Sequence, residues 1–222
     1  MNDFVEILSL ELQKNANAKI AAEQKAYMRN QFEYYGIKTP VRREIQKPFL
    51  IKRFLPEKAE AKQLVKAMWT KPQRDYQYIA QELMSKYIKQ LEEDDITIFE
   101  YIIAHKSWWD TVDFIATKLI GAYFKMYPNK RKPFVEKWLK SGNIWLQRSP
   151  LLFQLKYKEE LDNQLLTLTI SPLLGPKEFF FNKAIGWVLR DYSRVNPQWV
   201  LEYVHNTPLS NLSKREALRL IK

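Results

Sequence analysis

A recurring helix-start pattern is the feature of this sequence that most restricts its fold. Several segments begin with a polar, proline or glycine turn and continue with apolar residues at the spacing of a helix that buries one face. The starts follow one another at intervals of 31 to 39 positions. They carry a basic or aromatic residue: Arg43, Arg74, Trp109, Arg148, Lys183 and Lys214. The pattern predicts an all-α fold, a right-handed-type α-solenoid of HEAT-like helical repeats with a concave basic face, in one domain over residues 1–222.

The counts of three residue types exclude several classes of site. The chain has 5 glycines and no Gly-x-Gly pair, which excludes a P-loop and a dinucleotide-binding loop. It has no cysteine, 2 histidines and no His-Glu-x-x-His pattern, so we expect no metal site and no cofactor. The lack of cysteine also fits a reducing compartment.

The N-terminal segment and the hydropathy pattern bear on location. The first residues are acidic and polar, which predicts neither a signal peptide nor an anchor. The sequence also lacks a run of about 18 apolar residues, the length that a membrane span needs. We therefore expect a cytoplasmic protein with no membrane partner.

The charge balance indicates a polyanionic partner. The chain has 36 basic and 25 acidic residues, a net charge of +11 and a pI of about 9.6. Basic domains of this kind commonly bind nucleic acid. Stacked repeats would align the basic helix starts, and helix N-termini themselves attract phosphate, so the series predicts a phosphate-binding groove. The alternative is that these side chains cover apolar surface with their stems and keep their charges in water.

The segment HKSWWDTVDF contains the most informative carboxylate. Ser107 and Asp110 form a Ser-x-x-Asp pattern, which predicts a helix cap and explains Asp110 without a function. Asp113 lies one turn further on, on the apolar face, where a carboxylate needs a partner. Two alternatives stay open for it: a structural ion pair with an arginine of a neighbouring repeat, or catalysis. Trp108 and Trp109 point about 100° apart, so one of them is expected to face the groove.

Two further segments combine indoles or basic residues in a similar way. AIGWVLRDY places Trp187 and Arg190 on one helical face, and NIWLQRSPLLFQLKYK places Arg148 at a helix start with Lys156 eight residues on. The alternative interpretation is a core tryptophan and ordinary surface charges.

These segments together resemble a known family. KSWWDTVDFIA, NIWLQR, LLFQLKYK, KEFFFNKAIGWVLRDY, LSKREA and the upstream YYGIKTPVRREI are similar to the AlkD family of bacterial DNA alkylation repair glycosylases. The resemblance runs from about Tyr27 to Arg219. It implies a fold of HEAT-like repeats and excision of positively charged N3- or N7-alkylated purines from duplex DNA. It also implies a monomer in the bacterial cytosol or nucleoid.

The resemblance also implies roles for individual residues. The catalytic centre of the family matches Trp109, Asp113 and Trp187. Its phosphate-contacting arginine matches Arg148. The other DNA-binding positions match Arg43, Lys156, Arg190 and Tyr27. One departure is the Ser149-Pro150 pair, because proline suits a first helical turn; we therefore expect a helix that begins there, with Ser149 as its cap and Arg148 just outside it.

The residue types suit the implied reaction. Alkylation at N3 or N7 leaves a positive charge on the purine, and cleavage of the glycosidic bond creates oxocarbenium character on the sugar. A fixed carboxylate at Asp113 would stabilise that charge and position water, and indoles at Trp109 and Trp187 would pack against the cation. Two alternatives remain: a non-enzymatic HEAT-repeat protein that binds nucleic acid, and a protein-binding scaffold, for which Asp113 between indoles has no use.

Overall fold

The computed structural model describes residues 2–175 and 178–221. Over these residues the chain is helical, and its β-structure is one isolated bridge between Glu33 and Gln73. The predicted all-α class is therefore confirmed. Contacts divide the chain into two compact units, Met1–Leu91 and Glu92–Lys222, and one domain over residues 1–222 stays a prediction. In the described part, none of the helices combines the length and the apolar character that crossing a bilayer requires.

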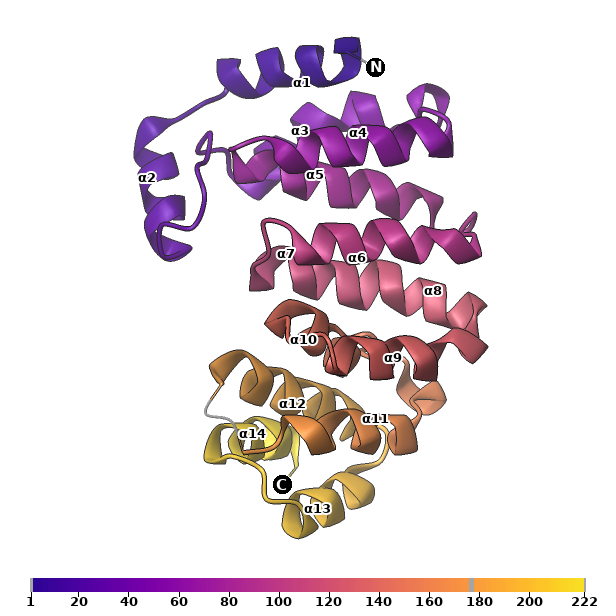
Figure 1. Cartoon of the computed structure of the whole chain (residues 1–222). Coiled ribbons are helices and arrows are strands. Elements are labelled where there is room, and N and C mark those ends of the chain that lie inside the picture. The colour runs from indigo at the N-terminus through magenta and orange to yellow at the C-terminus, as the bar shows by residue number, and fades with distance from the viewer. Residues whose placement is uncertain (1, 176–177, 222) are drawn as a thin grey trace. The chain divides into compact units, whose positions relative to one another are not determined.

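The first unit contains five α-helices (Figure 1). They are α1 (Asn2–Lys14), α2 (Ala18–Tyr27), α3 (Thr39–Leu50), α4 (Lys58–Thr70) and α5 (Arg74–Met84), with 3₁₀ turns η1 (Lys52–Phe54) and η2 (Ser85–Tyr87). Helices α4 and α5 pack against each other around buried side chains such as Trp69 and Ile79. Helix α1 adds Leu8 and Leu12 to the core, and both are fully buried.

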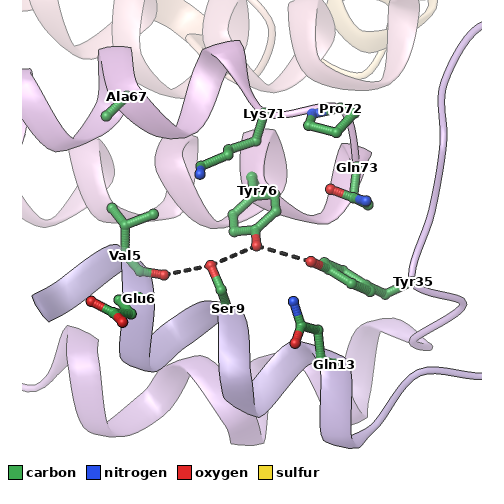
Figure 2. A pocket seen from close by; sticks show the side chains of 10 residues that line it. All are labelled: Val5, Glu6, Ser9, Gln13, Tyr35, Ala67, Lys71, Pro72, Gln73 and Tyr76. Atoms are coloured by element: carbon green, nitrogen blue, oxygen red, sulfur yellow. Dashed lines mark hydrogen bonds between the residues drawn. The ribbon is translucent and has the colours of Figure 1, made fainter. Parts of the chain in front are cut away.

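A directed chain of hydroxyl groups connects α1 to α5 in this unit (Figure 2). The Tyr76 hydroxyl donates to the Ser9 hydroxyl at 2.7 Å, and the Ser9 hydroxyl donates to the Val5 carbonyl oxygen at 2.6 Å. Because each hydroxyl has one proton, Tyr35 must donate in the 3.0 Å contact between its hydroxyl and that of Tyr76. These hydroxyl groups line a cavity of about 610 Å³.

The second unit contains a series of helix pairs in chain order (Figure 1). Its helices are α6 (Ile96–Ala104), α7 (Trp109–Phe114), α8 (Gly121–Met126), α9 (Arg131–Leu139), α10 (Ile144–Leu152), α11 (Asn163–Ile170), α12 (Phe179–Tyr192), α13 (Pro197–Asn206) and α14 (Asn211–Ala217). Its short turns are η3 (Glu93–Asp95), η5 (Pro128–Lys130), η6 (Lys158–Glu160), η7 (Ser171–Leu173) and η8 (Leu218–Leu220). Helices α7, α10, α12 and α14 contact one another in that order and form one layer. This layer carries most of the predicted site.

Helix α7 continues without a break through a π-helical segment, η4 (Ile115–Ile120), into α8. The wider turn changes the partners of the backbone carbonyls, and the Thr117 hydroxyl donates to the Asp113 carbonyl oxygen at 2.7 Å. Gly121 follows the wide turn, and a Cβ there would lie 2.9 Å from the Phe153 carbonyl oxygen. The lack of a side chain at Gly121 therefore lets the continuous helix of α7, η4 and α8 lie close to the C-terminal end of α10.

The approach of α14 to α12 also depends on a glycine. A Cβ on Gly186 would lie 2.5 Å from the Glu216 Cβ and 3.1 Å from the Ser213 carbonyl oxygen. The side chains of Phe181 and Leu189 fill the buried face of α12 around it. The turn expected ahead of α12, at Pro176 and Lys177, lies outside the described residues.

Candidate functional site

The centre of the site is an ion pair between α7 and α10. The Arg148 guanidinium donates from Nε to Asp113 Oδ1 at 2.8 Å and from Nη2 to Oδ2 at 2.9 Å. Its third nitrogen, Nη1, donates to the Phe180 carbonyl oxygen at the start of α12. Arg148 is 1% exposed, whereas the Asp113 side chain keeps 19% of its surface open to solvent. The arginine therefore lies behind the carboxylate and fixes its plane, and the carboxylate stays accessible.

The local structure of α10 explains how Arg148 reaches Asp113. The Asn143 side chain caps this helix by accepting from the backbone N–H groups of Trp145 and Leu146, at 2.9 and 3.1 Å. The helix therefore begins before Arg148, and the expected start at Ser149 is wrong. Pro150 lies inside the helix instead of in its first turn.

The cap expected for α7 is also different. Its N-cap residue is Trp108, without a capping hydrogen bond from its side chain. The Ser107 hydroxyl instead donates to the Ile103 carbonyl oxygen, at 2.5 Å, near the end of α6. Ser107 thus closes the preceding helix, and the predicted Ser-x-x-Asp cap at this residue is wrong.

Burial controls the charge state of the central carboxyl group. Burial raises the pKa of Asp113 above its ordinary value of 3.8, and the nearby Asp110 charge acts in the same direction. The hydrogen bonds and the charge of Arg148 oppose this rise in pKa. Arg148 therefore favours the ionised form of a carboxyl group that burial alone would leave more often protonated.

The two adjacent tryptophans have different surroundings. The Trp108 ring packs against Trp145 and Phe180, with ring centres 5.5 and 5.4 Å away. Trp109 is partly exposed and precedes Asp113 by four residues, which places the two on one face of α7. Trp109, and not Trp108, thus shares the face of α7 that carries Asp113, and its predicted role in the groove stays a prediction.

Trp187 of α12 lies next to the ion pair. The Arg148 Cζ is 5.6 Å from the centre of its ring, and the Lys183 Nζ is 5.8 Å from the same point. The indole is partly exposed. Cations contact aromatic rings at such distances, so two positively charged groups lie against this indole.

A second ion-pair cluster follows on α14. Glu216 pairs through Oε1 with Lys183 Nζ at 2.6 Å and through Oε2 with Arg190 Nη1 at 2.9 Å. The hydrogen bond from Lys183 and the positive charges of Lys183, Arg190 and Arg219 lower the pKa of the Glu216 carboxyl group, and burial opposes this shift. Sequence reasoning named Arg190 but missed Glu216, although it lies in the LSKREA segment.

The remaining predicted DNA-binding residues lie at the surface. In the second unit, Lys156 is exposed, and its backbone N–H donates to Asp191 Oδ2 at 2.7 Å. In the first unit, Tyr27 is 73% exposed at the end of α2. The Arg43 side chain is 60% exposed, with its Nε 3.5 Å from Glu82 Oε1. All three are open to a ligand, and DNA binding by them stays a prediction.

The recurring basic helix starts do not form one exposed row. Arg74 is fully buried, with its Cζ 3.9 Å from the centre of the Phe32 ring, and Arg148 is buried against Asp113. The expectation that the whole series lines a phosphate groove is therefore wrong for these two members. The Arg148 guanidinium connects α10 to α7 and α12 instead, and the Arg74 guanidinium packs against the Phe32 ring.

Among the residues that the structure describes, one group of carboxylates is close enough together to hold a metal ion. The side-chain oxygens of Glu92, Asp94 and Asp95 lie within 4.8 Å of one another. Glu92 and Asp95 form a reciprocal capping box at η3, and the Glu92 N–H donates to Asp95 Oδ2 at 2.8 Å. Helix capping accounts for this cluster.

Comparisons with known proteins identify the family. The chain is similar to a solved structure described as a predicted DNA alkylation repair enzyme from Enterococcus faecalis, with 32% identity and a TM-score of 0.87. The similarity covers 93% of this chain and 97% of that one. A search of curated proteins gave no match. The sequence profile of the family described as DNA alkylation repair enzyme matches residues 8–221, and the chain therefore belongs to this family.

Proposed function

We propose that this protein is a DNA glycosylase that hydrolyses the glycosidic bond of N3- or N7-alkylated, positively charged purines in duplex DNA. The observation that carries the proposal is the geometry of Asp113, whose two oxygens are fixed by Arg148 while 19% of the side chain stays open. A preorganised carboxylate of this kind stabilises a developing positive charge without reorganising during the reaction.

The reaction would use the positive charge of the substrate. An alkylated purine already carries the charge that makes it a leaving group, so the protein need not protonate the base. Asp113 would face the oxocarbenium character that develops on the deoxyribose and would position the attacking water. Trp109 and Trp187 would pack against the cationic base and the sugar, at about 0.5–2 kcal/mol for each cation–π contact.

Arg148 takes a positioning role in this proposal. The resemblance to the family implies a phosphate contact for this residue, but its guanidinium is buried and directed at Asp113. Its two hydrogen bonds orient the carboxylate and favour its ionised form. We assign the phosphate contacts to the more exposed Lys156, Arg190, Arg43 and Tyr27, with the enzyme acting as a monomer in the bacterial cytosol or nucleoid.

Release of free base tests the proposal. The protein is incubated with duplex DNA that contains 7-methylguanine at one position, and the released base and the abasic sites are quantified by chromatography and by alkaline strand cleavage. We expect both products in equal amounts, and none from the same duplex with guanine at that position. Binding to the methylated duplex with no released base would establish the alternative, a non-enzymatic nucleic-acid-binding protein.

A further inference from the structure

A chain of charged groups and one indole connects α7 to α14. Arg148 pairs with Asp113, and its Cζ lies 5.6 Å from the centre of the Trp187 ring. Lys183 Nζ lies 5.8 Å from the same ring centre and 2.6 Å from Glu216 Oε1. Trp187 thus contacts one cation that is paired with Asp113 and another that is paired with Glu216.

Lys183 and Arg190 are more exposed than the Glu216 carboxylate with which they pair. The side chains of Lys183 and Arg190 are 27% and 26% exposed, whereas that of Glu216 is 9% exposed. The carboxylate therefore lies below the two cations, and their outer sides stay open to solvent. One carboxylate between two cations leaves this cluster with a net charge of about +1.

Helix geometry fixes Glu216 against α12. Lys183 precedes Trp187 by four residues and Arg190 follows it by three, so all three lie on one face of that helix. Gly186 is the point where α14 approaches this face, because a Cβ there would lie 2.5 Å from the Glu216 Cβ. The missing Cβ of Gly186 therefore leaves the space that Glu216 occupies, and the Glu216 side chain reaches both cations from this position.

We propose that Glu216 is a positioning residue of the repair site. It holds Lys183 against the Trp187 ring, and this contact keeps the indole beside the Arg148–Asp113 pair. It acts without touching DNA, and it offsets part of the positive charge that Lys183 and Arg190 present to phosphate. The inference rests on the proposed glycosylase function, in which Trp187 faces the lesion.

The two effects of Glu216 predict a distinctive result. Removing its charge leaves Lys183 and Arg190 uncompensated, which strengthens attraction to the DNA backbone. The same change releases Lys183 from the indole, which weakens the positioning of Trp187. Excision should therefore fall while affinity for DNA does not, whereas loss of a direct DNA contact would weaken both.

Glu216→Gln tests this inference. We expect single-turnover excision of 7-methylguanine to fall on the order of ten-fold, the size of coupling found between contacting residues, while affinity for the duplex is unchanged or higher. Glu202→Gln is the matched control, because Glu202 is exposed on α13, accepts from Gln198 at 2.8 Å and loses the same charge. The control should keep the parent rate of excision.

Lys183→Met extends the test without leaving a buried carboxylate unpaired, because Glu216 keeps Arg190. We expect a similar loss of excision, and the double variant with Glu216→Gln should be no slower than either single variant, because both act through one contact. Excision by Glu216→Gln at the parent rate would overturn the inference. Losses that multiply in the double variant would do so as well.

A readout independent of activity separates this inference from the proposed function. The indole N–H signal of Trp187 in a ¹⁵N NMR spectrum, assigned by its loss in Trp187→Phe, should shift in Glu216→Gln and in Lys183→Met. If the parent protein releases no base, the proposed function fails, and the shift still reports whether Glu216 controls the indole. A signal unmoved in both variants contradicts the positioning role.

Discussion

Replacing Asp113 with asparagine removes one negative charge and little volume. The Asp113 carboxylate accepts two hydrogen bonds from Arg148, at 2.8 and 2.9 Å. In Asp113→Asn the amide oxygen accepts one of these two hydrogen bonds. The amide NH₂ group faces the other N–H of Arg148 and cannot accept from it, so the second hydrogen bond is lost. Because Arg148 is 1% exposed, its guanidinium has no route to water that would compensate the loss.

The replacement should lower both the stability of the protein and its rate of excision. Breaking a buried ion pair costs about 3–5 kcal/mol, and the hydrogen bond that the amide keeps reduces this to about 2 kcal/mol of unfolding free energy. For a chain of this size the melting temperature should fall by roughly 4–8 °C. Excision of 7-methylguanine should fall by about 10²-fold or more, because the negative charge that faces the oxocarbenium is lost.

A double variant separates catalysis from stability. Replacing both partners of a buried ion pair is often nearly neutral, so adding Arg148→Met to Asp113→Asn should restore much of the melting temperature. Single-turnover excision should stay low in the double variant. Recovery of excision together with the melting temperature would show that Asp113 is only half of a structural pair and would refute its catalytic role. Glu202→Gln again controls for the change in net charge.

Three further predictions follow from the same geometry. Burial raises the pKa of Asp113, and the ionised form is the active one, so excision should be lost as pH falls through a value above 3.8. In Arg148→Met this limb of the pH–rate profile should move to higher pH, because the groups that lower the pKa are gone. Trp109→Ala and Trp187→Ala should each slow excision by about 2- to 30-fold, the equivalent of one cation–π contact. The loss should differ between 3-methyladenine and 7-methylguanine when the excision rates of the two bases are compared. The logarithm of DNA affinity should fall with the logarithm of salt concentration, with a slope of roughly 0.9 per phosphate neutralised, and Lys156→Ala should lower that slope by about one unit in a salt titration. An affinity that does not change with salt would contradict the predicted electrostatic groove.

Sequence periodicity was sufficient for the helical class of this fold. Apolar spacing and turn residues are local signals, and they predicted the helices around Arg43, Arg74, Trp109 and Lys183. The predicted start of α10 was wrong. Pro150 was expected in the first helical turn, whereas the helix begins at the Asn143 cap, seven residues earlier. The π-helical segment after α7 was not predicted, because a rotation of 100° per residue describes an α-helix and not the wider turn of a π-helix.

The candidate site was predictable only in part, because pairing between helices is not a local property. The position of Asp113 on an apolar face indicated a buried partner, and the structure shows this partner to be Arg148, 35 residues away. The ion pair itself does not decide between a structural and a catalytic role, since both need a fixed carboxylate. Glu216 was missed because its two partners lie on another helix, and no spacing within its own segment indicates them.

Dependence on the charge of the lesion tests the central claim most directly. One duplex is prepared with 7-methylguanine and a second with neutral hypoxanthine at the same position, and single-turnover release of each base is measured with the parent protein. We expect equimolar release of 7-methylguanine and abasic sites, and hypoxanthine released at least 10²-fold more slowly, because Asp113 stabilises a reaction that the positive charge of the base makes possible. Release of both bases at similar rates, or of neither, would contradict the account.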